Sequence, residues 1–142
     1  MALSKAQAVE MFKSDDLIGI GMEADAVRRR LHPEGVVTYI IDRNINYTNV
    51  CTSGCLFCAF YRTAKSPEGY VLTRGEIAGK IAETKALGGV QILMQGGLHP
   101  EMKIGDYEKM LRGIKEDFDI HVHAFSPPEV RHIAETSGIT VD

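Results

Sequence analysis

Apolar residues recur along the chain at two different spacings, and the change from one spacing to the other predicts the order of its elements. Residues 4–14 and 22–31 carry apolar side chains every three or four positions, which predicts two amphipathic helices. Gly19 and Gly21 are expected to break the chain between these helices. The tetrapeptide His32-Pro33-Glu34-Gly35 then predicts a turn.

Three short apolar runs, rich in β-branched residues, follow the turn at residues 36–41, 90–95 and 120–125. The first run is apolar on both faces, as strands are when a parallel sheet is covered on both sides. The polar residues 42–46 are expected to end this first strand and to lead into the next loop. Residues 139–142 resemble the start of one more strand.

Helix-start signals separate these runs. Thr73 and Glu76 have the spacing of a capping box, which predicts a helix that ends near Leu87. A second helix is predicted over residues 106–117. The stretch Ser126-Pro127-Pro128-Glu129 opens a last helix, in which the glutamate is best explained as a cap. Strand, loop and helix, repeated three times, predict parallel strands with crossover helices and hence an α/β fold.

The length of the chain limits this architecture. We expect an N-terminal helical segment over residues 1–34 and, over residues 35–142, three to four βα units of a partial barrel. A (β/α) barrel needs ~200 residues or more, and this chain has 142. The barrel is therefore expected to be truncated, with an open three-stranded sheet as the alternative.

Ligand sites in parallel α/β folds collect where the carboxyl ends of the strands meet. The period of two along a strand separates residues that face helices from residues that face a lumen. The first group is Val90, Ile92, Met94, Ile120, Val122 and Ala124. The second group is Gln91, Leu93, Gln95, His121, His123 and Phe125.

Composition and charge exclude some classes of partner. Hydrophobic residues make up 44% and charged residues 25% of the chain, which is ordinary for a globular domain. The net charge of −3 argues against a nucleic-acid partner. No run approaches the ~18 apolar residues of a membrane span, and the N-terminus lacks a secretory pattern, so we expect no membrane partner and a cytoplasmic location.

All three cysteines lie in the stretch 49–61, as Cys51, Cys55 and Cys58. An iron–sulfur cubane is usually held by four thiolates, so three would leave one iron open to another ligand, which indicates chemistry. The rival interpretation is a zinc site. Its fourth ligand would be a histidine, from the set His99, His121 and His123. The spacing favours iron–sulfur, and three cysteines so close together make a poor disulfide framework.

The cysteine spacing, with Phe57 before the last cysteine, resembles the signature of the radical S-adenosylmethionine (SAM) superfamily. Within it, the chain resembles the branch that makes menaquinone intermediates of the futalosine pathway and the deazaflavin precursor, and most of all the dehypoxanthine futalosine cyclases. The stretches that carry this finer resemblance are residues 42–49, 58–62, 69–72, 91–100 and 121–129.

This resemblance implies a (β/α)6 partial TIM barrel in which Cys51, Cys55 and Cys58 hold a [4Fe-4S] cluster and SAM chelates the fourth iron. A low-potential electron donor would then allow formation of a 5′-deoxyadenosyl radical, which removes a hydrogen from the ribose of dehypoxanthine futalosine before the ring closes. The alternatives are a sister enzyme, aminofutalosine synthase or deazaflavin-precursor synthase, or a non-catalytic, truncated metal-binding product.

The resemblance also implies cofactor-binding residues near the cluster loop. Gly96 and Gly97 would cradle SAM, although a tight strand exit explains two glycines equally simply. Phe57 and the inward-facing Gln95 are assigned to the same site. Family members often have Gly-Gly-Glu at this strand end, whereas this chain has Leu98 after the glycines.

His121 and His123 are the candidate catalytic residues, because both are expected on the lumen face of one strand. They would also suit a metal pair. Since neither of the last two predicted strands carries an inward-facing carboxylate, contact with substrate or with the lumen is favoured.

Overall fold

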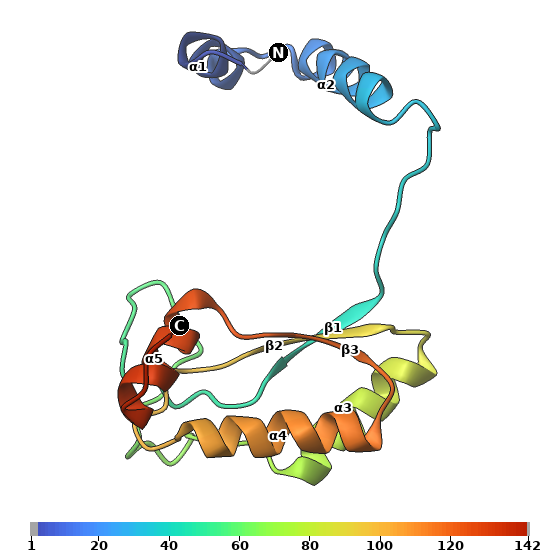
Figure 1. The fold of residues 1–142 in the computed structure, drawn as a ribbon. Coiled ribbons are helices and arrows are strands. Elements are labelled where there is room, and N and C mark those ends of the chain that lie inside the picture. The colour runs from blue at the N-terminus through green and yellow to red at the C-terminus, as the bar shows by residue number, and fades with distance from the viewer. Residues whose placement is uncertain (1–2, 142) are drawn as a thin grey trace. The chain divides into compact units, whose positions relative to one another are not determined.

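The boundary between Tyr39 and Ile40 divides the computed structural model, which describes residues 3–141, into two units. The first unit contains α1 (Lys5–Lys13) and α2 (Leu17–Leu31), coloured blue in Figure 1. Neither helix has a buried residue. In the described chain, no helix combines the length and the apolar character that a bilayer span requires.

The expected break at Gly19 and Gly21 is wrong, because α2 begins at Leu17 and runs through both glycines. Asp16 caps this helix, and its Oδ1 accepts the Gly19 N–H at 2.9 Å. A glycine inside a helix costs about 1 kcal/mol relative to alanine, which weakens the helix without ending it.

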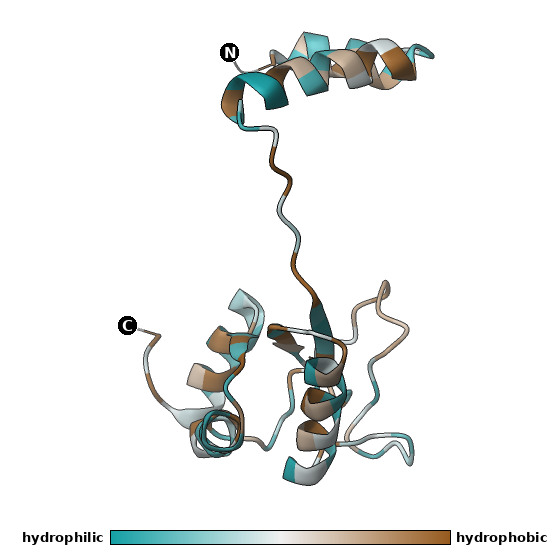
Figure 2. Ribbon diagram, turned by 90° about the vertical axis from the view of Figure 1, so that its right-hand side faces the viewer, coloured by the Kyte–Doolittle hydropathy of each residue, from teal (hydrophilic) through white to brown (hydrophobic). Residues whose placement is uncertain are grey.

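The predicted strand over residues 36–41 is also wrong. This segment is extended and exposed, and Figure 2 draws it largely brown because its residues are apolar. The first strand is instead the polar stretch β1 (Asp42–Asn46), which the hydrophobic pattern places after the strand. Pairing decides the position of this strand, since each of its residues lies in register with a residue of the next strand, whereas residues 36–40 have no such partner.

Three parallel strands form the sheet of the second unit, in the order β1-β2-β3, and confirm the predicted α/β fold. The other two strands are β2 (Gln91–Gln95) and β3 (His121–Ala124). The helices that follow the three strands are α3 (Arg74–Ala86), α4 (Ile104–Asp117) and α5 (Pro127–Ser137). The capping box of α3 is as predicted, and Gly138, with φ of 68°, ends α5.

The core lies between one face of the sheet and the helices, with α3 and α4 along that face in Figure 1. Ile92 and Met94 are fully buried in it, as predicted from their alternation. Val90, which was predicted to share their face, precedes β2 and is 60% exposed. The opposite face is mostly polar. In register across it lie Asp42, Asn44, Asn46, Gln91, Leu93, Gln95, His121 and His123.

Phe125 was expected on the lumen face and instead joins the core. Its φ of 66° interrupts the alternation of β3 and turns its ring toward the helices. There it stacks edge-on against Tyr47 and Tyr107, with ring centroids 5.9 and 5.4 Å away. The further strand expected at residues 139–142 does not begin within the described residues 139–141, and Asp142 lies outside them.

Candidate functional site

A cavity of about 280 Å³ lies where β1 and β2 end and α5 begins. Several residues singled out from the sequence line it together. They are Cys51, Cys58, Gln95, Gly96 and Gly97, accompanied by Asn46. The expectation that the strand ends would converge is therefore confirmed in the described chain.

Two buried residues that follow β1, Thr48 and Asn49, line this cavity. Thr48 Oγ1 donates to the Tyr70 carbonyl at 2.6 Å, and the Asn49 amide bonds the backbone of Glu68 and Tyr70. The Thr48 carbonyl accepts the Gly97 N–H at 2.9 Å. The exit of β1 is thus tied both to the long loop that follows the cysteines and to the end of β2.

The cysteine loop is held at both of its ends. Cys51 N–H donates to the Arg62 carbonyl at 2.9 Å, and Thr52 N–H donates to the Leu98 carbonyl at 3.1 Å. Between these anchors residues 53–57 are exposed, and Leu56 and Phe57 at the tip are almost fully accessible to solvent. The loop therefore has fixed ends and a loosely packed middle.

The donor chemistry of this loop fits an iron–sulfur cluster, since thiolates are its usual ligands. Cys51 and Cys58 already line one cavity. Cys55 is exposed, and its Sγ lies 3.1 Å from the Ser53 hydroxyl. Within the described residues, no three Cys, His, Asp or Glu side chains surround a common point. Cys55 therefore fits the cluster by its chemistry and spacing, although it does not line the cavity with the other two cysteines.

Gly96 and Gly97 are held so closely by their neighbours that neither has room for a side chain. A Cβ on Gly96 would lie 2.5 Å from the Tyr47 ring, and one on Gly97 would lie 2.2 Å from the Val50 carbonyl oxygen. Close packing against the exit of β1 is therefore sufficient to explain both glycines, and it brings their backbone to the wall of the cavity.

Glu129 joins all three strand ends through one buried carboxylate. Its Oε1 accepts the Tyr47 hydroxyl at 2.6 Å and the Gly96 N–H at 2.8 Å. Its Oε2 accepts both the backbone N–H and the hydroxyl of Ser126, at 2.8 and 2.6 Å. The predicted capping role of Glu129 is thus part of a larger network. Burial, reinforced by the adjacent Glu129 carboxylate, raises the pKa of Tyr47 far above its usual range.

Other predicted site residues lie outside the cavity lining. Phe57 is at the exposed loop tip. His121 and His123 are exposed on the uncovered face of the sheet, in register with Gln91 and Leu93. Their assignments stay predictions.

Sequence reasoning missed Tyr47, Thr48 and Asn49 as a unit. A usable signal exists in part, because Thr and Asn just after a strand often bond nearby backbone. The hydrogen-bond partners of Thr48 and Asn49, however, lie about twenty residues further along the chain. Only the fold specifies those partners.

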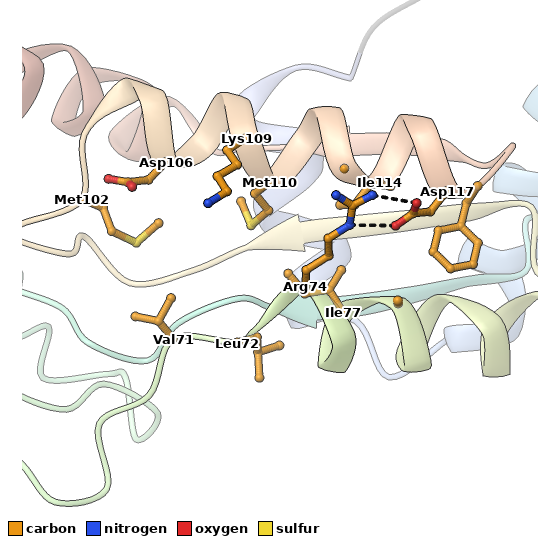
Figure 3. A pocket seen from close by; sticks show the side chains of 13 residues that line it. Val71, Leu72, Arg74, Ile77, Met102, Asp106, Lys109, Met110, Ile114 and Asp117 are labelled. Carbon is orange, nitrogen blue, oxygen red and sulfur yellow. Dashed lines mark hydrogen bonds and ion pairs between the residues drawn. The ribbon is translucent and has the colours of Figure 1, made fainter.

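A second hollow, of about 240 Å³, lies between α3 and α4 and shares no lining residue with the first. Figure 3 shows Arg74 from the start of α3 paired with Asp117 at the end of α4. Two bonds, at 2.9 and 2.7 Å, join the guanidinium to the carboxylate, and they hold the pKa of Asp117 below its usual value. Most of the remaining lining is apolar, and it contains none of the residues predicted to carry chemistry.

A comparison with known protein families identifies the same superfamily as the cysteine spacing. Residues 45–142 match the sequence profile described as the radical SAM superfamily. The matched region contains the whole cysteine loop and every residue that lines the cavity.

Individual relatives match over nearly the whole chain. A cyclic dehypoxanthine futalosine synthase of Halalkalibacterium halodurans is 47% identical over 141 residues, which are 99% of this chain and 38% of that protein. The Streptomyces coelicolor protein of the same name is 40% identical, over 99% of this chain and 36% of its own length. A 5-amino-6-(D-ribitylamino)uracil–L-tyrosine 4-hydroxyphenyl transferase of Methanocaldococcus jannaschii is 38% identical, over 98% of this chain and 40% of its own length. The chain thus spans less than half the length of these curated relatives.

Proposed function

Because the chain belongs to the radical SAM superfamily, we propose that Cys51, Cys55 and Cys58 hold a [4Fe-4S] cluster and that SAM occupies the adjoining cavity. Cys51 and Cys58 line this cavity together with the backbone of Gly96 and Gly97, which supports the assignment. When bound, the cluster and SAM would supply radical chemistry that takes a hydrogen atom from the substrate, with the required electron coming from a low-potential donor.

The residues of the chain have the task of binding and orienting the cofactor and keeping competing hydrogen donors away. We assign cofactor binding to Gln95, Gly96, Gly97 and Phe57. His121 and His123 remain the candidates for contact with the substrate. We further propose that residues 35–142 are part of a (β/α)6 partial barrel, preceded by the helical segment 1–34.

For the reaction, we propose cyclisation of dehypoxanthine futalosine on the futalosine route to menaquinone, with electrons from a low-potential donor. The observation that carries this choice is the 47% identity to a cyclic dehypoxanthine futalosine synthase over 99% of the chain. The alternative is a sister radical SAM reaction, which the 38% identity to the 4-hydroxyphenyl transferase supports.

Anaerobic reconstitution with iron and sulfide tests the cluster assignment. We expect the full chain to bind about four irons and, once reduced, to give an EPR signal that shifts when SAM is added. Each of Cys51→Ala, Cys55→Ala and Cys58→Ala should lose this signal. Leu56→Ala, at the fully exposed tip of the same loop, is the matched control and should retain it. Stoichiometric zinc without iron, or a cluster that survives all three cysteine substitutions, would overturn the assignment.

Product analysis separates the sister reactions. The reconstituted chain is incubated with SAM, a reductant and either dehypoxanthine futalosine or 5-amino-6-(D-ribitylamino)uracil with L-tyrosine. A cyclised product from the first substrate is expected. A product from the second pair alone would contradict the cyclase assignment and support the sister reaction.

A further inference from the structure

Glu129 is the only Asp, Glu, Lys, Arg or His among the described residues that line the cavity. It is 3% exposed, and no ion pair joins it to a cation anywhere in the described chain. A buried carboxylate without a cation gives its surroundings a negative potential, and it is screened less than a charge on the surface would be. The cavity is therefore anionic.

The acceptor positions of this carboxylate are already occupied. Each oxygen accepts two hydrogen bonds, and on each oxygen one of the two donors is a backbone N–H, from Gly96 or Ser126. Backbone N–H groups only donate, so both carboxyl oxygens of Glu129 are committed as acceptors. Because a carboxylate offers about four acceptor sites, Glu129 has none left for direct contact with a ligand.

The N–H groups of the two glycines are also occupied. Gly96 N–H donates to Glu129, and Gly97 N–H donates to the Thr48 carbonyl. Neither is left to bind an anion, so this turn differs from the phosphate-binding glycine loops, whose N–H groups face the ligand.

A carboxylate from the start of α5 therefore stands beside the glycine pair, although Leu98 follows that pair in the sequence. We infer that Glu129 makes the cavity prefer the positively charged sulfonium of SAM over the neutral thioether of S-adenosylhomocysteine. Glu129 acts as a positioning residue, through its buried charge and through the Gly96–Gly97 turn. This inference rests on the proposed function, because it takes SAM to be the ligand.

The test measures the dissociation constants of both ligands for the reconstituted full chain by equilibrium dialysis. The readout is the ratio of the constant for S-adenosylhomocysteine to that for SAM. We expect the wild type to favour SAM and Glu129→Gln to lower the ratio about tenfold, since one buried charge is removed near a charged ligand. Glu129→Asp keeps the charge and should keep the ratio, even where both affinities fall.

Glu135→Gln is the matched control, because it removes one exposed charge from the same helix, α5. It should leave the ratio within about twofold of the wild type. The inference is overturned if Glu129→Gln weakens both ligands equally or if Glu135→Gln lowers the ratio as much.

The wild-type ratio keeps the inference testable even if Glu129→Gln does not fold. A ratio near one in the wild type overturns the inference and leaves the proposed function standing. A wild-type chain that binds neither ligand overturns the proposed function itself. The two failures are therefore distinguishable.

Discussion

Gly97 has a role at the scale of a single residue that depends on the absence of a side chain. It sits where the end of β2 meets the backbone that leads into the cysteine loop, and a Cβ there would meet Val50 and Cys51. Backbone cannot move aside as a flexible side chain can. The requirement for glycine thus arises from packing between two segments that are far apart in the sequence.

We expect Gly97→Ala to destabilise the chain by about 1–3 kcal/mol, the usual cost of overpacking. Gly79→Ala is the matched control. Gly79 lies inside α3 with no atom near its missing Cβ, so alanine should stabilise the helix by up to about 1 kcal/mol. Urea unfolding of the two variants measures both effects. Equal stability of Gly97→Ala and wild type would contradict the packing argument.

At the scale of elements, the helices that follow β1 and β3 begin with similar sequences but in different surroundings. Thr73 and Glu76 cap α3 reciprocally at the surface, where both are exposed. Ser126 and Glu129 open α5 beside the cavity, where the same carboxylate also holds Tyr47 and Gly96. The same capping pattern therefore stabilises only a helix end in α3, whereas in α5 it also connects the ends of three strands.

We expect Thr73→Ala to cost about 1 kcal/mol, the usual value for loss of an N-cap. Ser126→Ala removes a hydroxyl that donates to a buried carboxylate, and hydrogen bonds to charged groups contribute about 1.5–3 kcal/mol. Ser126→Ala should therefore cost roughly twice as much. Urea unfolding of both variants checks this comparison, and equal costs would show that Glu129 does not depend on the Ser126 hydroxyl.

At the scale of the whole molecule, the two units differ in how much they bury. The second unit has a continuous core that links its sheet to α3, α4 and α5. In the first unit, α1 and α2 have 9 and 15 residues and no buried side chain. Large apolar residues of this unit are exposed, among them Phe12 at 94% and Ile18 at 79%.

Hydrogen exchange should reveal this difference directly. Isolated helices shorter than about 12–15 residues are marginal in water. Amides in α1 and α2 should therefore exchange at least about a thousandfold faster than those of Ile92 and Met94 in β2. Mass spectrometry of exchanged peptides measures both sets. Strong protection of residues 17–31 would show that the apolar side chains of α2 are covered in solution.

The residues of the site could be predicted from the sequence only in part. The cysteine spacing and the glycine pair are local patterns, and both were recognisable. The Tyr47–Glu129 bond joins residues 82 positions apart, and no local pattern records such a partner. The exposed position of Cys55, and the separation of His121 and His123 from the cavity lining, likewise depend on side-chain placement.

The sequence by itself determined the parallel α/β order, the helix caps and the cysteine motif, because each of these follows from spacings of a few residues. Tertiary structure decided where pairing begins. Residues 36–40 of the apolar run remain unpaired, whereas the polar stretch 42–46 is a strand, because β2 lies in register only with the polar stretch. It also decided that Phe125 turns into the core and that Glu129 serves the end of each strand. Such outcomes require contacts between distant segments, which hydrophobic periodicity does not specify.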